Sequence, residues 1–109
     1  MKRNLFTPWP PSDSDLSWLA GLLDGEGSFF KGKNNGLVRI ECQMTDEDTI
    51  AKAARLMGVG YGKRKPLPGR KTVYRLALAG PRAEIVMREL APLMGTRRQQ
   101  QIRDALKER

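Results

Sequence analysis

Segments with apolar residues at helical spacing alternate along the chain with segments in which apolar and polar residues take turns. Apolar residues from Leu16 to Leu23 recur every three or four positions, as on the buried face of a helix. Val38, Ile40 and Cys42 instead alternate with charged or polar neighbours, as in a strand with one buried face. The predicted elements, in chain order, are a helix over 14–24, strands over 27–33 and 37–44, a helix over 46–57, strands over 59–65 and 71–79, and helices over 81–94 and 96–108.

The order of these elements repeats a unit of one helix followed by one hairpin. An asparagine-glycine turn at 34–36 joins the first two strands, and a loop with two prolines joins the other two. We therefore expect an α+β fold with an αββαββα core and a further C-terminal helix, in which a four-stranded antiparallel sheet carries helices on one face. The uncovered face is expected to carry Arg39, Glu41, Gln43, Lys63, Lys65 and Arg75.

The chain has the length of a single domain. Its 109 residues suffice for one hydrophobic core but not for two. Residues 1–13 hold three of the seven prolines and lack hydrophobic periodicity, so we predict a flexible N-terminal tail followed by one domain over 14–109. No apolar run reaches the roughly 20 residues of a membrane span, and none follows the basic start as in a signal peptide. An intracellular protein that is not secreted and has no membrane partner is expected.

The composition excludes several kinds of catalytic site. The chain has no histidine and a single cysteine, Cys42. Zinc sites of cysteine and histidine, histidine-dependent catalytic triads and internal disulfides are therefore excluded. Any metal ion has to be held by oxygen ligands, and any hydrolysis has to proceed without a histidine base.

Positive charge is concentrated in the second half of the chain. The net charge is +8, but residues 1–57 hold seven basic and eight acidic residues, whereas residues 58–109 hold thirteen basic and four acidic ones. Such an asymmetry is typical of a protein that binds a phosphate backbone. A basic surface without that function, as in a ribosomal protein, is the alternative.

Residues 19–27 read Leu-Ala-Gly-Leu-Leu-Asp-Gly-Glu-Gly. This segment resembles the LAGLIDADG motif of homing endonucleases and maturases, and the similarity to members with a single motif extends over roughly 15–107. The other matching segments are 28–30, 42–45, 58–61 and 92–100. The resemblance implies a saddle-shaped sheet and a homodimer in which two motif helices pack about a two-fold axis. Symmetry then predicts a pseudo-palindromic DNA target.

Small residues indicate where the two motif helices meet. Gly21 and Gly25 are four residues apart with Ala20 beside them, so one helix face lacks bulk and lets another backbone approach closely. The predicted dimer interface consists of Leu19, Ala20, Gly21, Leu22 and Gly25. A glycine helix stop combined with packing inside one chain is the alternative explanation.

Glu26 is expected one or two residues past the end of the motif helix, against the negative end of the helix dipole. In a dimer the two Glu26 carboxylates converge, which is costly without a cation. Carboxylate, backbone carbonyl and phosphate oxygens suit Mg²⁺, for which Mn²⁺ can substitute. The resemblance implies that Glu26 is the catalytic metal ligand, in place of the more frequent aspartate. A surface acid at a helix end is the alternative, and Asp24 is expected to satisfy backbone donors.

The resemblance implies two further catalytic positions. Arg97 matches a basic residue that lies close to the scissile phosphate in the family, and an exposed helix cation is the equal alternative. Comparable members carry a glutamine and an arginine that organise the hydrolytic water, at places where this chain has Asp46 and Ile50. Asp46 is a candidate for positioning a water, and its simpler role is at the N-terminus of the following helix.

The polar face of the sheet and the adjoining loop are the predicted DNA contacts. Strand alternation assigns Tyr61, Lys63 and Lys65 to the DNA-facing side. It assigns Arg64 to the other side. Gln43 matches a base-contacting position of the family and carries both a donor and an acceptor for a base edge. The predicted DNA-binding set is Arg39, Gln43, Tyr61, Lys63, Lys65, Arg70, Lys71 and Arg75. A solvated strand and loop that protect a sheet edge are the alternative for its basic members.

Together these patterns predict a homodimeric, Mg²⁺-dependent, site-specific endonuclease that makes a staggered break in double-stranded DNA. The rival is a nucleic-acid binder that does not cleave, such as a maturase acting on intron RNA or a DNA-binding regulator. The altered residues Asp46 and Ile50 favour this rival. A third reading, a basic structural protein of a ribonucleoprotein, predicts a monomer that does not respond to divalent metal.

Overall fold

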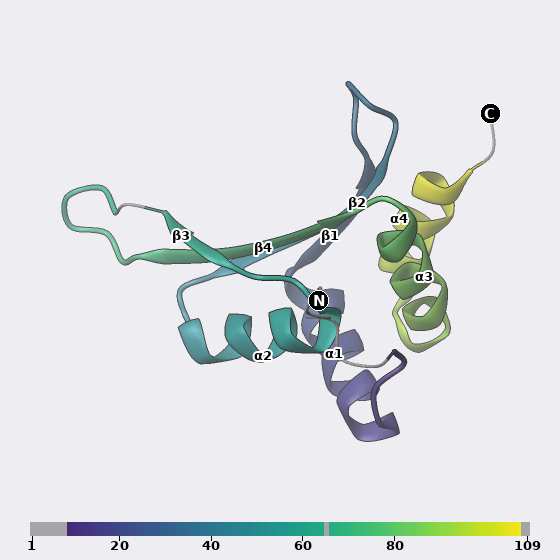
Figure 1. The fold of residues 1–109 in the computed structure, drawn as a ribbon, viewed down its shortest axis with the longest axis horizontal. Helices are drawn as coiled ribbons and strands as arrows, with labels where there is room; N and C mark the ends of the chain where they lie inside the picture. The colour runs from purple at the N-terminus through teal and green to yellow at the C-terminus, as the bar shows by residue number, and fades with distance from the viewer. Residues whose placement is uncertain (1–8, 65, 108–109) are drawn as a thin grey trace, which may run out of the picture.

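The computed structural model describes residues 9–64 and 66–107. In this part of the chain a sheet of two long hairpins carries helices on one side (Figure 1). The elements are α1 (Asp13–Glu26), β1 (Gly27–Lys31), β2 (Val38–Met44), α2 (Glu47–Met57), β3 (Gly62–Arg64), β4 (Val73–Ala79), α3 (Pro81–Leu90), a 3₁₀ turn (Ala91–Leu93) and α4 (Thr96–Leu106). The predicted α+β class and the αββαββα order with a further C-terminal helix are confirmed.

The four strands form one antiparallel sheet in the order β1-β2-β4-β3. The two hairpins join along β2 and β4, whose register pairs Gln43 with Arg75. Alternate residues are buried, so Ile40 and Leu76 face the helices, whereas Gln43 and Arg75 are exposed on the opposite, open side. The predicted division into an apolar and a polar face follows from this alternation.

The hydrophobic core fills the space between the sheet and the helices. Each helix contributes one apolar face, and burial of a side chain the size of leucine stabilises the fold by about 1.5–3 kcal/mol. The largest fully buried side chains are Leu19 and Leu23 of α1, Ile40 and Cys42 of β2, Ile50 and Met57 of α2, Leu76 of β4, and Val86, Met87 and Leu90 of α3. One continuous core therefore fixes the end of α1 against the strands.

Helix α1 continues two residues further than predicted, to Glu26. The glycine that ends it is Gly27 and not Gly25, and the Gly27 amide donates to the carbonyl of Leu23. A Cβ atom on Gly27 would lie 2.9 Å from the Leu23 side chain, so only glycine lets β1 start directly beneath the helix. The prediction that Glu26 lies past the helix end is wrong, because Glu26 is the last helical residue.

Strand β3 is shorter than predicted because the end of α2 uses part of its expected length. Gly58 adopts a left-handed conformation with φ 73°. Its amide donates to the carbonyl of Arg55, and the Val59 amide donates to that of Ala54 at 3.0 Å. This pair of bonds is the Schellman arrangement of a helix C-terminus. Residues 58 and 59 therefore finish a helix and do not begin a strand.

Helix α3 also ends before the predicted boundary. It stops at Leu90 and passes into the 3₁₀ turn that contains Pro92, and α4 follows from Thr96. Proline has no amide hydrogen and clashes with the preceding turn, which explains why one helix does not run to residue 94.

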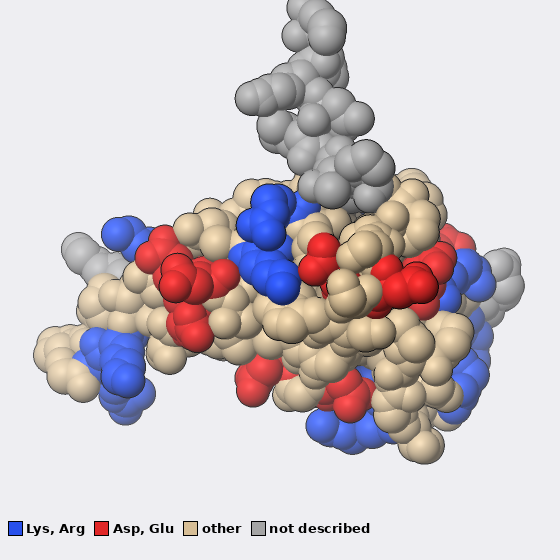
Figure 2. Space-filling view, turned by 90° about the horizontal axis from the view of Figure 1, so that it is seen from below, with Lys and Arg blue, Asp and Glu red and all other residues tan. Residues whose placement is uncertain are grey.

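The last features of the fold are the charges on the helix side and the start of the described chain. Acidic and basic side chains are interspersed on the face below the helices (Figure 2). Trp9, which the sequence places in the tail, packs against the core, and residues 1–8 of the predicted tail lie outside the described part. No helix of the described residues is long and apolar enough to cross a membrane.

Candidate metal ligand and nucleic-acid interface

An open hollow of about 600 Å³ lies on the open side of the sheet, beside the end of α1. Three of the predicted functional residues, Glu26, Gln43 and Arg75, meet there. The complete lining is Glu26, Ser28, Glu41, Cys42, Gln43, Arg64 and Arg75. A separate hollow of about 340 Å³ between the first hairpin and α4 contains none of the predicted site residues. The first hollow thus brings the predicted metal ligand together with two of the predicted DNA-binding residues.

Glu26 is the carboxylate at the end of α1 and is exposed. Its neighbour in space is Cys42, which pairs across the sheet with Gly27. Burial and then the charge of Glu26 raise the pKa of the Cys42 thiol to about 11. The thiol is therefore protonated at neutral pH. Glu26 is the group beside the motif helix that can offer a hard oxygen ligand.

The end of α1 is held by the start of α4. Arg98 donates from Nε to the carbonyl of Asp24 at 2.8 Å and from Nη2 to that of Gly25 at 3.4 Å. Its Nη1 donates to the Gln101 side chain at 3.0 Å, and the residue is 8% exposed. The Asp24 carboxylate in turn accepts from the Gly95 amide at 2.9 Å, as expected of a residue that satisfies backbone donors. These contacts fix the backbone immediately before Glu26.

Arg98 is a residue that the sequence reasoning missed. That reasoning assigned the catalytic arginine to Arg97, which is exposed on the first turn of α4. The available signal was the helical spacing of Arg98 with Ile102 and Ala105, the three buried residues of α4. An arginine at the apolar positions of a helix indicates a buried partner. The role of Arg97 near a phosphate stays a prediction.

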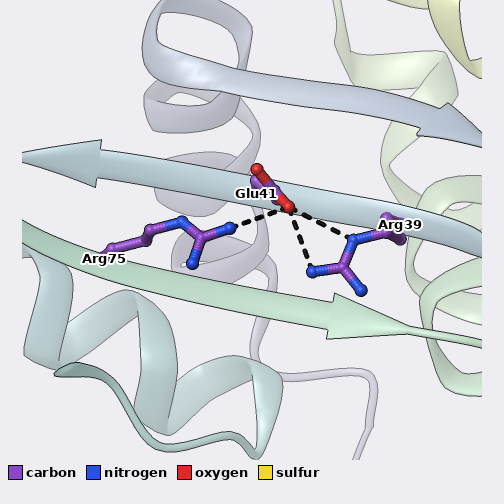
Figure 3. Close-up of polar contacts among 3 residues, drawn as sticks. All are labelled: Arg39, Glu41 and Arg75. Atoms are coloured by element: carbon purple, nitrogen blue, oxygen red, sulfur yellow. Dashed lines mark hydrogen bonds and ion pairs between the residues drawn. The ribbon is translucent and has the colours of Figure 1, made fainter. Parts of the chain in front are cut away.

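Glu41 bridges two arginines on the open side of the sheet (Figure 3). Arg39 donates to Glu41 Oε2 from Nη2 at 3.0 Å and from Nε at 3.2 Å, and Arg75 Nη2 lies 2.9 Å from the same oxygen. Burial opposes ionisation of Glu41, but the hydrogen bonds and charges of the two arginines outweigh it and lower the pKa of the carboxyl. The carboxylate is therefore ionised at neutral pH and holds both guanidinium groups.

The pairing of β3 with β4 reverses the predicted faces of β3. Lys63 pairs with Tyr74, and Arg64 pairs with Val73. Directly paired residues of antiparallel strands project to the same side. Arg64 therefore shares the open side with Arg75 and lines the hollow, whereas Lys63 lies on the helix side. The assignment of Lys63 to the open side, and of Arg64 away from it, is wrong.

Tyr61 also lies on the helix side. Its hydroxyl donates to Glu47 of α2 at 2.8 Å, and its ring packs edge-on against Tyr74 with the centroids 6.4 Å apart. The hydrogen bond to Glu47 raises the pKa of the Tyr61 hydroxyl. The prediction that Tyr61 faces DNA from the open side is wrong, because α2 and Tyr74 engage the side chain.

The remaining predicted site residues have varied surroundings. Arg70 and Lys71 are exposed in the loop between β3 and β4, which extends away from the helices (Figure 1). Lys65 lies outside the described residues. Asp46 caps α2, because its Oδ1 accepts from the Thr49 amide at 3.4 Å. The simpler of the two roles predicted for Asp46 is thus observed.

The predicted dimer-interface residues divide into buried and exposed members. Leu19 and Ala20 are 0% and 2% exposed and belong to the core, so they present no surface to a second chain. Their assignment to an interface is wrong. Gly21 and Gly25 are exposed, and a Cβ atom at either glycine would meet no atom of the described residues within 4 Å. With half-buried Leu22 they form the glycine face of α1, which packing among residues 9–64 and 66–107 does not explain.

The described part of the chain does not form a metal site by itself. Among residues 9–64 and 66–107, no three Asp, Glu or Cys side chains gather closely enough to hold a metal ion. Glu26 offers one carboxylate at the hollow, and Glu41 is engaged by arginines. The donor set fits a hard cation such as Mg²⁺ only if further oxygens come from a second chain and from a bound phosphate.

Comparison with known proteins identifies the fold. No family model and no curated protein matches the sequence. Two crystal structures of the homing endonuclease I-CvuI match with TM-scores of 0.61 and 0.57, at 18% identity, over 82% of this chain. One is a complex with the I-CreI target in 2 mM Mg in which the DNA is not cleaved, and the other is a complex with its own target in 2 mM Ca. This chain covers 64% of the length of that relative, and the similarity establishes a shared fold.

Proposed function

We propose that this chain, which has the LAGLIDADG homing endonuclease fold, is one subunit of a homodimeric, divalent-metal-dependent, site-specific DNA endonuclease. The observation that carries the proposal is the position of Glu26. Its carboxylate ends the motif helix at the edge of a hollow that also contains Arg64 and Arg75. A metal-binding acid beside a basic, open sheet is the combination that hydrolysis of a phosphodiester in duplex DNA needs.

Glu26 is the residue of this chain that would hold the metal. Mg²⁺, when bound, neutralises phosphate charge and lowers the pKa of water, which provides a nucleophile without a histidine base. Arg98 and Asp24 hold the backbone of the motif helix immediately before Glu26, so the backbone that carries the Glu26 side chain is fixed in place. Arg97, at the start of α4, is proposed to stabilise charge on the phosphate.

The glycine face of α1 supports the proposed homodimer. Glycine in a helix costs roughly 1 kcal/mol relative to alanine, and Gly21 and Gly25 make no close contact with the part of the chain that the structure describes that would require glycine. Close approach of a second α1 explains both glycines. Two copies of α1 about a two-fold axis bring two Glu26 side chains together, one for each DNA strand.

The open side of the sheet is the proposed DNA-binding surface. Arg39, Gln43, Arg64 and Arg75 lie on it, and the exposed loop residues Arg70 and Lys71 extend the basic surface beyond the sheet. A curved antiparallel sheet can lie along the major groove, where arginine and glutamine recognise guanine and adenine edges. Many of the remaining contacts are expected on phosphates.

Metal-dependent cleavage tests the proposal. The purified full chain is incubated with a randomised duplex library and Mg²⁺, and new DNA ends are sequenced. We expect staggered breaks within a pseudo-palindromic sequence, lost by at least a thousandfold in Glu26→Gln, on the order of the losses seen when a key catalytic group is removed. DNA binding should persist in that variant. The matched control is Glu89→Gln, the same change at an exposed acid of α3, which should cleave normally.

The alternative is a nucleic-acid binder that does not cleave, and one observation favours it. Ile50 is 0% exposed and Asp46 caps α2, so neither side chain stands ready to organise a hydrolytic water. A protein of this kind would enrich a duplex or an intron RNA without producing ends in Mg²⁺ or Mn²⁺. Full activity of Glu26→Gln would instead contradict the assignment of the metal ligand.

A further inference from the structure

Glu41 is an acid in the middle of a surface that is otherwise suited to a polyanion. On β2 it lies opposite Ser28 of β1 and Ala77 of β4, at the centre of the open side. A carboxylate there repels phosphate and cancels one positive charge, which weakens electrostatic binding to any DNA. Its neighbours show that a small neutral residue fits this face. Attraction to the DNA phosphates therefore does not explain the presence of Glu41.

The contacts of Glu41 supply that reason. Its Oε2 atom accepts from two donors of Arg39 at 3.0 and 3.2 Å and forms an ion pair with Arg75 Nη2 at 2.9 Å, and the two guanidinium groups lie on opposite sides of the carboxylate (Figure 3). A guanidinium carries five N–H donors. One edge of each arginine is thus fixed by Glu41, while other N–H groups stay available to a second partner.

We infer that Glu41 is a positioning residue of the DNA interface, which holds Arg39 and Arg75 in orientations that read base edges. This inference rests on the proposed function. Bidentate recognition of guanine O6 and N7 depends on the orientation of the guanidinium plane, whereas a phosphate contact tolerates a mobile side chain. Anchored by Glu41, the two arginines have fewer accessible rotamers in the free protein. They are therefore less able to follow the phosphates, and they lose less side-chain entropy when they bind a base. Glu41 thereby lowers the affinity of the protein for DNA of any sequence and increases its discrimination between sequences.

A simpler role, a cross-strand ion pair that only stabilises the sheet, makes a different prediction. Removal of a merely structural acid lowers the melting temperature and leaves the relative affinities for different DNA sequences unchanged. Removal of a positioning acid changes those relative affinities. It also adds one unit of positive charge per subunit to the interface, so binding to unrelated DNA becomes tighter and more sensitive to salt.

The test compares the unmodified protein with Glu41→Gln. Both proteins select from a randomised duplex library in Ca²⁺, and their affinities for the selected site and for unrelated duplexes are measured from 50 to 300 mM salt. We expect discrimination to fall roughly tenfold at the base pairs nearest the two arginines. Because each subunit of the proposed dimer loses one carboxylate, the slope of log affinity against log salt should become steeper by about 2 per dimer.

Two matched variants separate position from charge. Glu41→Asp keeps the charge but shortens the side chain by one methylene group, so discrimination should fall while the salt slope stays unchanged. Glu89→Gln makes the same charge change on α3, away from the open side, and should alter neither quantity. Melting curves identify any variant that does not fold, and in that case the comparison rests on the variant that does.

The outcomes distinguish the inference from the function beneath it. If the unmodified protein selects a site and both Glu41 variants show the same base preferences as that protein, Glu41 has no positioning role and the proposed function stands. If the unmodified protein selects no sequence at all, the proposed function fails and the inference fails with it.

Discussion

Arginine is used in two different surroundings in this molecule. At the junction of α1 and α4, Arg98 is 8% exposed and donates to the backbone carbonyls of Asp24 and Gly25. On the open side, the side chains of Arg39 and Arg75 are 29% and 44% exposed and share the carboxylate of Glu41. The first guanidinium is enclosed by fixed acceptors, and the other two are anchored on one edge beside solvent.

The difference separates stability from recognition. A buried guanidinium cannot leave its backbone partners without exposing unsatisfied carbonyls, so its removal should destabilise the fold. Removal of a partly exposed guanidinium costs the fold little, because water can solvate the partner that it leaves, so its removal should act mainly on binding. The surroundings of each arginine, and not its residue type, decide which property depends on it.

The largest effect is expected for Arg98→Met, which tests whether the buried arginine stabilises the fold. Methionine preserves much of the buried volume but removes all donors, which leaves the carbonyls of Asp24 and Gly25 without their charged partner. We expect the free energy of unfolding to fall by about 2–3 kcal/mol, measured by urea denaturation. The neighbouring exposed residue gives the control, because Arg97→Met should change stability by less than about 0.5 kcal/mol. Equal losses in the two variants would contradict the structural role of Arg98.

A smaller effect is expected at the other half of the same junction. Asp24→Ala removes the acceptor of the Gly95 amide and a negative charge near the N-terminus of α4. Loss of such a cap costs about 1 kcal/mol, and urea denaturation measures it. Asp24→Asn keeps an oxygen acceptor, so its loss of stability should be about half that of Asp24→Ala. A fully stable Asp24→Ala protein would show that Arg98 alone fixes this end of α1.

The sequence predicts the fold well where local periodicity determines an element. The order of helices and strands follows from short-range patterns, and the errors occur where distant partners set the boundary. Helix α1 reaches Glu26 because its last carbonyls are bonded by Arg98, 74 residues away. No local signal near Gly25 contains that information. The late start of β3 has a more local cause. Glycine after an apolar helix is typical of a Schellman cap, and Gly58 provides one at the end of α2.

The candidate site is predictable to a similar, limited extent. The motif identifies Glu26, and alternation on the long strands places Gln43 and Arg75 correctly on the open side. On β3 the alternation groups residues correctly but does not tell which group is buried, because this three-residue strand has no apolar residue to mark the core side. For that reason the sequence alone assigns Arg64 to the wrong side. Only the pairing with β4 places it on the open side.

The smallest expected effect concerns the ionisation of Glu41. Its pKa is lowered from the ordinary value of 4.5 in the folded protein, so the carboxylate adds stability that is fully present above pH 4.5. That stability is lost as the pH falls through the lowered pKa, and for a partly exposed ion pair it amounts to less than about 1 kcal/mol. Titration of the Glu41 side-chain carbonyl carbon by NMR should therefore give a midpoint below 4.5. In Arg39→Gln the midpoint should rise, because one of the two guanidinium partners is gone, whereas Arg103→Gln on α4 should leave it unchanged. A midpoint at or above 4.5 in the unmodified protein would mean that burial outweighs both arginines and that the carboxylate does not hold them in solution.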